Sequence, residues 1–284
     1  MARSTPYAVN TTADKVLRAL GRYQYLTLNQ ATLASGFSPR SRTWVSTALK
    51  ELTDNHYTGM HRLSNRSGYG GAPGYWILAR RGIRYLDLAG VIHRPRIRNG
   101  FDPDAEDYRL RHILAVNDVL IACERFAAET EGVELQSLTH DLYLAREPIT
   151  VELGEGRQTR LTADGRVRLT AFGYSYDIWV EVDRGTEPIG RWKAKVEAIL
   201  RYAETLTEPL TVMVVTTAGP KRFTDLWRWT GEQLQAMHRE PWADLFRFTA
   251  CPATERVPDA WLTAPTWVRP GDAQGYPLIE GGRP

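Results

Sequence analysis

The 284-residue sequence has little cysteine and no long apolar run. Its two cysteines, Cys123 and Cys251, belong to no CxxC or Cys/His cluster, which argues against a disulfide framework and a structural zinc site and favours two buried thiols. No stretch approaches the ~18 to 20 apolar residues of a membrane span, and the first residues lack the apolar core of a signal peptide. We therefore expect a cytoplasmic protein with no membrane partner.

Two enzymatic signatures are also missing. No GxxxxGK[ST] motif is present, so ATPase or helicase activity is not indicated. The six histidines never show the His-hydrophobic-His spacing of histidine-based nicking enzymes, which disfavours that mechanism. Thirteen tyrosines leave a tyrosine nucleophile open, although no motif singles one out.

Charge is distributed unevenly along the chain. Residues 1–100 carry fifteen Lys and Arg against four Asp and Glu, a balance of +11, whereas the remaining residues have a balance of −8. A basic N-terminal third beside an acidic remainder is typical of a protein in which one domain neutralises phosphate groups and the other has a separate task. A basic surface without a ligand is the alternative interpretation.

The pattern of the N-terminal third predicts a winged helix-turn-helix domain over residues 1–90. The expected elements are helices at 13–21, 27–35, 39–54 and 79–89, and strands at 57–63 and 75–78 around a Gly-rich loop. In such a domain the third helix enters the major groove of duplex DNA and the wing meets phosphate or minor groove. A winged helix that contacts only protein is the alternative. The candidate DNA-binding residues are Arg40, Arg42, Thr43, Ser46, Lys50, Arg62 and Arg66.

The rest of the chain predicts an α/β domain with a mixed sheet flanked by helices. After a linker at 91–107, this domain spans 108–250, and a Pro/Gly-rich tail at 251–284 wraps the surface or is partly mobile. The expected elements are a helix at 108–130, strands at 133–144, 158–170 and 174–183, a helix at 189–206, a strand at 210–217, a helix at 222–238 and a strand at 245–249.

One strand places acidic side chains on a single face. Asp177, Trp179, Glu181 and Asp183 alternate with apolar residues, and Asp164 lies on the strand expected before them. Three converging carboxylates (Asp164, Glu181 and Asp183) would form an oxygen-ligand site for Mg²⁺ or Mn²⁺. Two alternatives stay open. Asp164 and the following glycine form only a hairpin turn, or Glu181 and Asp183 belong to a structural network with Arg184, Arg191 or Lys193.

The sequence resembles the replication-relaxation family of plasmids and other mobile elements over residues 12–220. The resemblance is carried by the helix segment 111–118, by Ala-Asp-Gly at 163–165, by Tyr202 and above all by Val-Glu-Val-Asp-Arg-Gly-Thr-Glu at 180–187. It implies a PD-(D/E)XK nuclease-like second domain, with Asp164 and Glu181 as the motif acids. It also implies a DNA-binding protein of replication or mobilisation, possible as a homodimer or with other plasmid proteins.

The sequence departs from the PD-(D/E)XK motif at one position. The motif lysine should follow Glu181 by two residues, and Asp183 stands there. Lys193 or Lys195, in the next helix, could supply the missing cation. Two functions therefore remain: a metal-dependent enzyme that nicks DNA through Asp164, Glu181, Asp183 and one of these lysines, and a non-catalytic initiator or transcriptional regulator with a degenerate nuclease fold.

Overall fold

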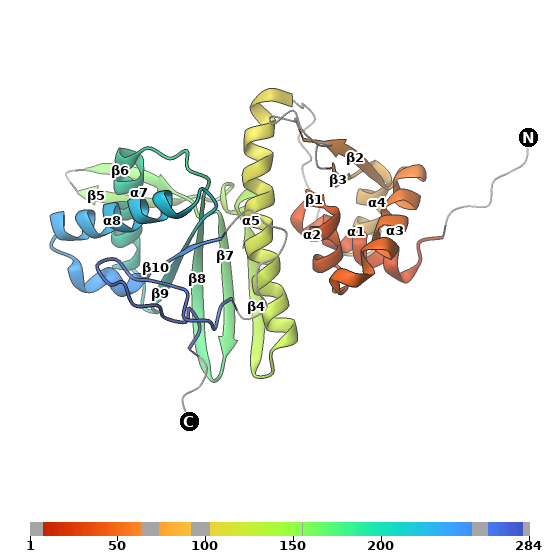
Figure 1. The fold of residues 1–284 in the computed structure, drawn as a ribbon. Coiled ribbons are helices and arrows are strands. Elements are labelled where there is room, and N and C mark those ends of the chain that lie inside the picture. Colours follow the sequence, from red (N-terminus) through yellow and green to blue (C-terminus); the bar gives the residue numbers. More distant parts are fainter. Residues whose placement is uncertain (1–7, 64–73, 92–102, 155, 252–260, 281–284) are drawn as a thin grey trace, which may run out of the picture. The chain divides into compact units, whose positions relative to one another are not determined.

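The computed structural model describes residues 8–63, 74–91, 103–154, 156–251 and 261–280 and divides the chain into two compact units. The first unit is Met1–Ile121 and the second is Ala122–Pro284. The structure contains helices as well as a mixed sheet, which confirms the α/β class (Figure 1). Among the described residues, no helix combines the length and the apolar character that a membrane crossing requires.

The first unit consists of helices around a small antiparallel sheet with strand order β1-β3-β2. Its elements are α1 (Thr11–Tyr23), β1 (Leu26–Thr27), α2 (Leu28–Ala34), the 3-10 turn η1 (Pro39–Ser41), α3 (Arg42–Asp54), β2 (Thr58–Arg62), β3 (Gly74–Leu78), α4 (Arg80–Leu88) and the first part of α5 (Pro103–Glu129). The predicted helices and strands of this region are therefore confirmed within a few residues. The expected wing loop, with Arg66, lies outside the described residues.

Local signals in the sequence explain where these helices begin and what they bury. Asn10 caps α1 by accepting from Ala13 N, and Thr27 and Gln30 form a reciprocal capping box at the start of α2. The predicted stripe of α3, namely Val45, Ala48, Leu49 and Leu52, is buried, and it packs in the core with Val16, Leu17 and Leu20 of α1. The opposite face of α3 is left to solvent.

The long helix α5 differs from the prediction in two ways: it starts earlier, and most of it belongs to the first unit and not to the second. It begins at Pro103, inside the expected linker, and its residues up to Ile121 belong to the first unit. The reason is side-chain hydrogen bonding: Asn117 Nδ2 donates to Tyr25 O at 2.6 Å, and Gln30 Nε2 donates to Leu114 O at 2.7 Å. These buried amides tie the helix to the small sheet and to α2, which amphipathic periodicity could not indicate.

The second unit contains a five-stranded mixed sheet with strand order β10-β9-β8-β7-β4 and a separate hairpin of β5 and β6. The pairs β4–β7 and β7–β8 are antiparallel, whereas β8–β9 and β9–β10 are parallel. The elements are β4 (Val133–His140), α6 (Asp141–Leu144), β5 (Ile149–Gly154), β6 (Arg157–Leu161), β7 (Gly165–Ala171), β8 (Tyr174–Asp183), α7 (Ile189–Ala203), β9 (Leu210–Thr216), α8 (Pro220–Ala236), the 3-10 helix η2 (Glu240–Leu245) and β10 (Phe246–Ala250).

The mixed sheet was predicted correctly, but the prediction of a single strand at 158–170 was wrong. That segment forms two strands, because β6 pairs with β5 while β7 pairs with β4 and β8. The strand β5 has no counterpart in the prediction, and the strand expected at 133–144 ends at His140 and is followed by a short helix. Pairing partners distant in sequence decide these boundaries.

One face of the sheet is covered by α7 and α8 (Figure 1). Trp179 on β8 and Val212 and Val214 on β9 share a core with Trp192 of α7 and Leu226 of α8. Because side chains alternate along a strand, Glu181 and Asp183 project toward these same helices. Their chemistry is therefore set by what α7 and α8 bring to that face.

The described part of the C-terminal tail, residues 261–280, packs against the second unit. Val268 forms an isolated bridge with Phe248 of β10, and Trp267 is completely buried. Trp227 of α8 donates its Nε1–H to Arg269 O at 2.6 Å. This segment wraps the unit as expected. Of the two cysteines, Cys123 is buried as predicted, whereas Cys251, which follows β10, is partly exposed.

Candidate functional site

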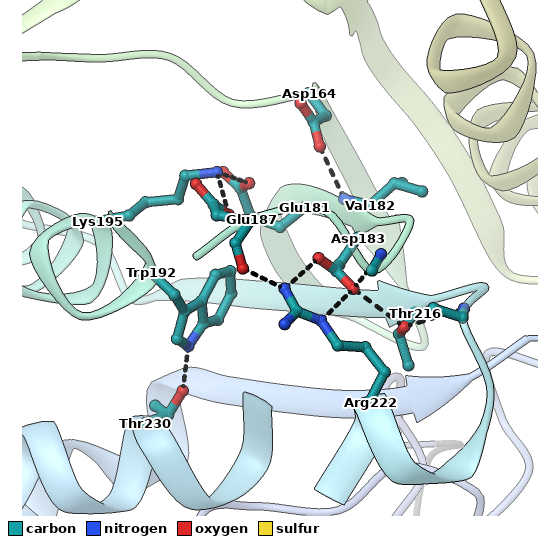
Figure 2. A network of polar contacts seen from close by, with 12 residues as sticks. Asp164, Glu181, Val182, Asp183, Glu187, Trp192, Lys195, Thr216, Arg222 and Thr230 are labelled. Atoms are coloured by element: carbon teal, nitrogen blue, oxygen red, sulfur yellow. Dashed lines mark hydrogen bonds and ion pairs between the residues drawn. The ribbon is translucent and has the colours of Figure 1, made fainter. Parts of the chain in front are cut away.

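Asp164 immediately precedes β7 and lies beside the C-terminal part of β8. Its backbone N–H donates to Val180 O at 3.0 Å, and its Oδ2 accepts from Val182 N at 2.7 Å. These two hydrogen bonds hold Asp164 next to Glu181, as the predicted neighbouring strands require (Figure 2). Since β6 and β7 belong to different sheets, Asp164 and the following glycine do not form a hairpin turn between them.

Glu181 is buried, with 2% of its surface exposed, and both its carboxylate oxygens have donors. Trp179 Nε1 donates to Oε1 at 2.7 Å, and Lys195 Nζ donates to Oε2 at 2.9 Å (Figure 2). Burial raises the pKa of Glu181, attraction to Lys195 opposes this shift, and repulsion from Asp164 adds to it. Glu181 is thus a desolvated acid close to a second carboxylate.

Lys195, in the second turn of α7, supplies a cation to this acid. Its Nζ lies 2.9 Å from Glu181 and 3.3 Å from Glu187 Oε2. Burial alone would lower the pKa of Lys195, but attraction to Glu181, Asp164 and Glu187 outweighs it and raises the pKa. The ammonium group therefore stays charged at neutral pH.

Lys193, the other lysine predicted for this role, lies elsewhere. Its Nζ pairs with Glu232 of α8 at 2.7 Å, and that carboxylate is 44% exposed. The two lysines are two positions apart on a helix, and positions two apart do not share a face. Of the two candidates, the structure brings only Lys195 to Glu181.

Asp183 does not join the other two acids, contrary to the three-carboxylate prediction. Arg222, in the first turn of α8, binds it through two hydrogen bonds, Nε to Oδ2 at 2.8 Å and Nη2 to Oδ1 at 2.7 Å. Gly185 N and Thr216 Oγ1 also approach Oδ2. Within the described ranges, no group of three or more His, Cys, Asp or Glu residues is placed to hold a metal ion.

Arg222 also organises the loop between β8 and α7. Its Nη2 donates to Glu187 O at 2.7 Å, while the side chain of Glu187 contacts Lys195 (Figure 2). Gly185 in this loop has φ +81, and a Cβ there would lie 2.8 Å from Ala218 Cβ. The segment 181–187 is therefore a single network in which Asp183 anchors the loop and Glu187 helps to position Lys195.

Sequence reasoning missed Arg222 and did not assign a role to Glu187. A buried carboxylate at the end of a strand requires a cation or several hydrogen-bond donors, so the sequence indicated that Asp183 needs a partner. The sequence could not identify that partner, because Arg222 is separated from Asp183 by α7 and β9.

Asp177 occupies the outer part of the same strand face. Arg166 donates to it from Nε at 2.8 Å and from Nη2 at 2.6 Å, and Arg168 contacts it at 3.1 Å. Burial would raise the pKa of Asp177, but the two arginines outweigh it and lower the pKa. This acid is held in ion pairs with both arginines. Glu181 and Asp183 also form ion pairs, as one alternative expected, but with Lys195 and Arg222 as their partners.

Asp164 and Glu181 offer carboxylate oxygens, the ligand type that a hard divalent cation such as Mg²⁺ prefers, and both oxygens of Glu181 also accept hydrogen bonds from Trp179 and Lys195. Such ions are commonly bound through one or two carboxylates, with water and substrate phosphate completing the coordination. A third carboxylate is therefore not required. Asp183, engaged by Arg222, is not available as the third ligand that the sequence suggested.

The predicted DNA-binding residues of the first unit lie at its surface where they are described. Arg40 in η1 and Arg62 on β2 are exposed, and α3 exposes Arg42, Thr43, Ser46 and Lys50. Helix α3 therefore buries one stripe and presents a basic and hydroxyl-bearing face to solvent.

Fold and site together define a mixed α/β protein with a basic helical unit and a second unit that holds two acids and a lysine at the centre of its sheet. Residues 17–212 match the model of the replication-relaxation family, and the chain belongs to that family. Membership connects the protein with the replication or relaxation of plasmids and other mobile elements and implies interaction with DNA. No curated protein matches the chain.

Proposed function

We propose that this chain binds duplex DNA of a plasmid or mobile element through its first unit and nicks it through its second. Residues 1–90 act as a winged helix in this proposal, and residues 108–250 as a PD-(D/E)XK-like nuclease domain. The observation that carries the proposal is the approach of Lys195 to Glu181 beside Asp164. An acid pair with a lysine from the following helix supplies the groups that the motif requires, despite Asp183 at the usual lysine position.

The helical unit supports the binding half of the proposal. Its net positive charge favours a polyanion, and α3 combines exposed basic residues at its start and middle with a buried stripe that fixes its orientation. Arg40, Arg42 and Lys50 would neutralise phosphates, while Thr43 and Ser46 would lie nearer to base edges. Arg62 and Arg66 would contact the backbone from the wing.

The acid pair and the lysine would divide the chemistry between them. Asp164 and Glu181 would hold Mg²⁺ or Mn²⁺, which, when bound, activates water and stabilises charge on a phosphodiester. Lys195 would hold a positive charge beside the reacting phosphate, and Glu187 and Arg222 would keep that lysine in place. Trp179 would orient Glu181 through its indole N–H.

Nicking of supercoiled plasmid by the full-length protein tests the proposal. With Mg²⁺ or Mn²⁺ we expect conversion to the open circle, and we expect Asp164→Ala and Glu181→Ala each to abolish it while duplex affinity changes little. Asp177→Asn is the matched control, because Asp177 lies on the same strand face but is engaged by Arg166 and Arg168. Loss of nicking in the control as well would show that the acids act only through stability.

The second candidate is a non-catalytic initiator or regulator in which the same unit serves as a docking or dimerisation platform. It is favoured by the full hydrogen bonding of Glu181 and by the ion pair of Asp183 with Arg222. If the wild-type protein binds DNA but cleaves no supercoiled, linear or single-stranded substrate with either metal, this candidate replaces the nuclease. Removal of Glu181 or Asp183 should then lower the melting temperature.

A further inference from the structure

Trp44 is a large apolar side chain that is not buried in the core of the first unit. It stands in the first turn of α3 and is 70% exposed, whereas Val45, Ala48 and Leu49 of the same helix are buried. A tryptophan left in water forgoes the largest burial free energy available to any side chain. Its position is therefore better explained by a ligand than by packing.

The surroundings of Trp44 indicate the charge of that ligand. Thr47 is the exposed residue one turn from Trp44, and the other exposed side chains in this part of α3 are Arg42, Thr43, Ser46 and Lys50. Residues 38–50 include three basic residues and no acidic one. Among the described residues of α3, Trp44 is the one exposed large apolar side chain, which does not amount to the contiguous apolar patch of a protein interface, and the charge favours a polyanion.

We infer that Trp44 reads duplex DNA by contacting thymine in the major groove; this rests on the proposed binding of DNA by α3. Thymine presents a C5 methyl group and the O4 acceptor on its major-groove edge. An indole offers an apolar ring to the methyl group and an N–H to the acceptor. Lys50 and Arg42 would bind phosphates on either side.

The test uses the full-length protein and a randomised duplex library. Sequences selected by the wild type are remade with uracil at each thymine in turn, which removes only the methyl group. We expect uracil at one or more positions to weaken wild-type binding, and Trp44→Ala to weaken binding to the selected duplex about tenfold, equivalent to about 1.4 kcal/mol, with no further loss on uracil. Trp44→Phe should retain the response to uracil.

Two controls separate base reading from general binding. Arg42→Ala should weaken binding to every duplex and lower its dependence on salt by about one counterion, while Trp44→Ala should leave that dependence unchanged. Since Trp44 is exposed, circular dichroism melting of Trp44→Ala should match that of the wild type. If Trp44→Ala selects the same sequences with the same affinity and the same response to uracil, the inference is wrong and DNA binding stands. If the wild type binds no duplex from the library, both the inference and the proposed function of this unit fail.

Discussion

Glu181 and Asp183 are two residues apart on one strand, yet their environments differ. Glu181 is bound by the Trp179 indole and by Lys195, and Asp183 by the guanidinium of Arg222. One acid therefore belongs to the candidate site, and the other anchors the loop that follows the strand. The identity of the cation, more than the spacing of the carboxylates, distinguishes the two roles.

The two lysines of α7 give a prediction with an internal control. Lys195→Ala should lower the nicking rate by on the order of 10²-fold, the usual cost of removing a key electrostatic stabiliser. Lys193→Ala should change it little, because its partner Glu232 lies in solvent, where an ion pair contributes about 0–1 kcal/mol. Single-turnover rates at saturating enzyme measure both. Equal losses for the two variants would contradict the role given to Lys195.

Asp118 in the first unit predicts a dependence of stability on pH. Burial raises its pKa to about 6, and the hydrogen bond from Gln30 Nε2 at 2.6 Å only partly opposes this. The folded state therefore binds a proton more tightly than the unfolded state. The stabilisation is complete below pH ~4 and is lost as the pH rises through about 6, a change of at most about 3 kcal/mol.

Asp118→Asn should remove this dependence, since an amide can still accept from Gln30 and does not ionise. Its free energy of unfolding in urea should exceed that of the wild type increasingly between pH 4 and pH 7. Asp54→Asn, at the exposed end of α3, controls for the change in net charge. A constant difference between Asp118→Asn and the wild type across this range would show that Asp118 does not titrate differently on folding.

At the scale of elements, α4 lies against the start of β2 because it has a glycine at the contact. A Cβ on Gly82 would lie 2.2 Å from Tyr57 O, and that carbonyl already accepts from Ala79 N. Gly82→Ala should therefore lower the free energy of unfolding by about 1–3 kcal/mol, although alanine has the higher helix propensity. Denaturant unfolding measures the change.

Gly231 in α8 is the matched helical glycine with space around it. A Cβ there meets only Pro270 Cβ at 4.0 Å, an ordinary contact. Gly231→Ala should stabilise the protein by up to about 1 kcal/mol through helix propensity. If Gly82→Ala were equally stabilising, this result would contradict the close contact between α4 and the Tyr57 carbonyl.

At the scale of the whole molecule, the charge asymmetry predicts that affinity for DNA resides in the first unit. Replacing Arg40 and Arg42 together by alanine should weaken duplex binding and reduce the slope of log K against log salt by about two, one for each lost phosphate contact. Fluorescence anisotropy over a range of salt concentrations measures this slope.

The control for the Arg40 and Arg42 double variant removes the same amount of charge from the second unit. It replaces Arg157 and Arg160, which are exposed on β6. Their double alanine variant should leave the slope unchanged. A slope that fell with this pair, and not with Arg40 and Arg42, would place phosphate recognition in the second unit.

Most helices and strands of both units follow from local patterns in the sequence. The stripe of Val45, Ala48, Leu49 and Leu52, the caps at Asn10 and Thr27 and the alternation along β8 are properties of neighbouring residues. The sequence therefore determined the α/β class, the mixed sheet and the shared face of Trp179, Glu181 and Asp183. It also indicated that a cation from the next helix could replace the missing lysine.

Only the tertiary structure decided which groups meet. Lys195 and not Lys193 reaches Glu181, Arg222 withdraws Asp183 from the site, and α5 joins the first unit through Asn117. Each of these contacts joins residues that are far apart in the chain. Ion pairs and buried amide hydrogen bonds depend on distances of about 3 Å between such residues, and periodicity fixes only the face on which a side chain lies.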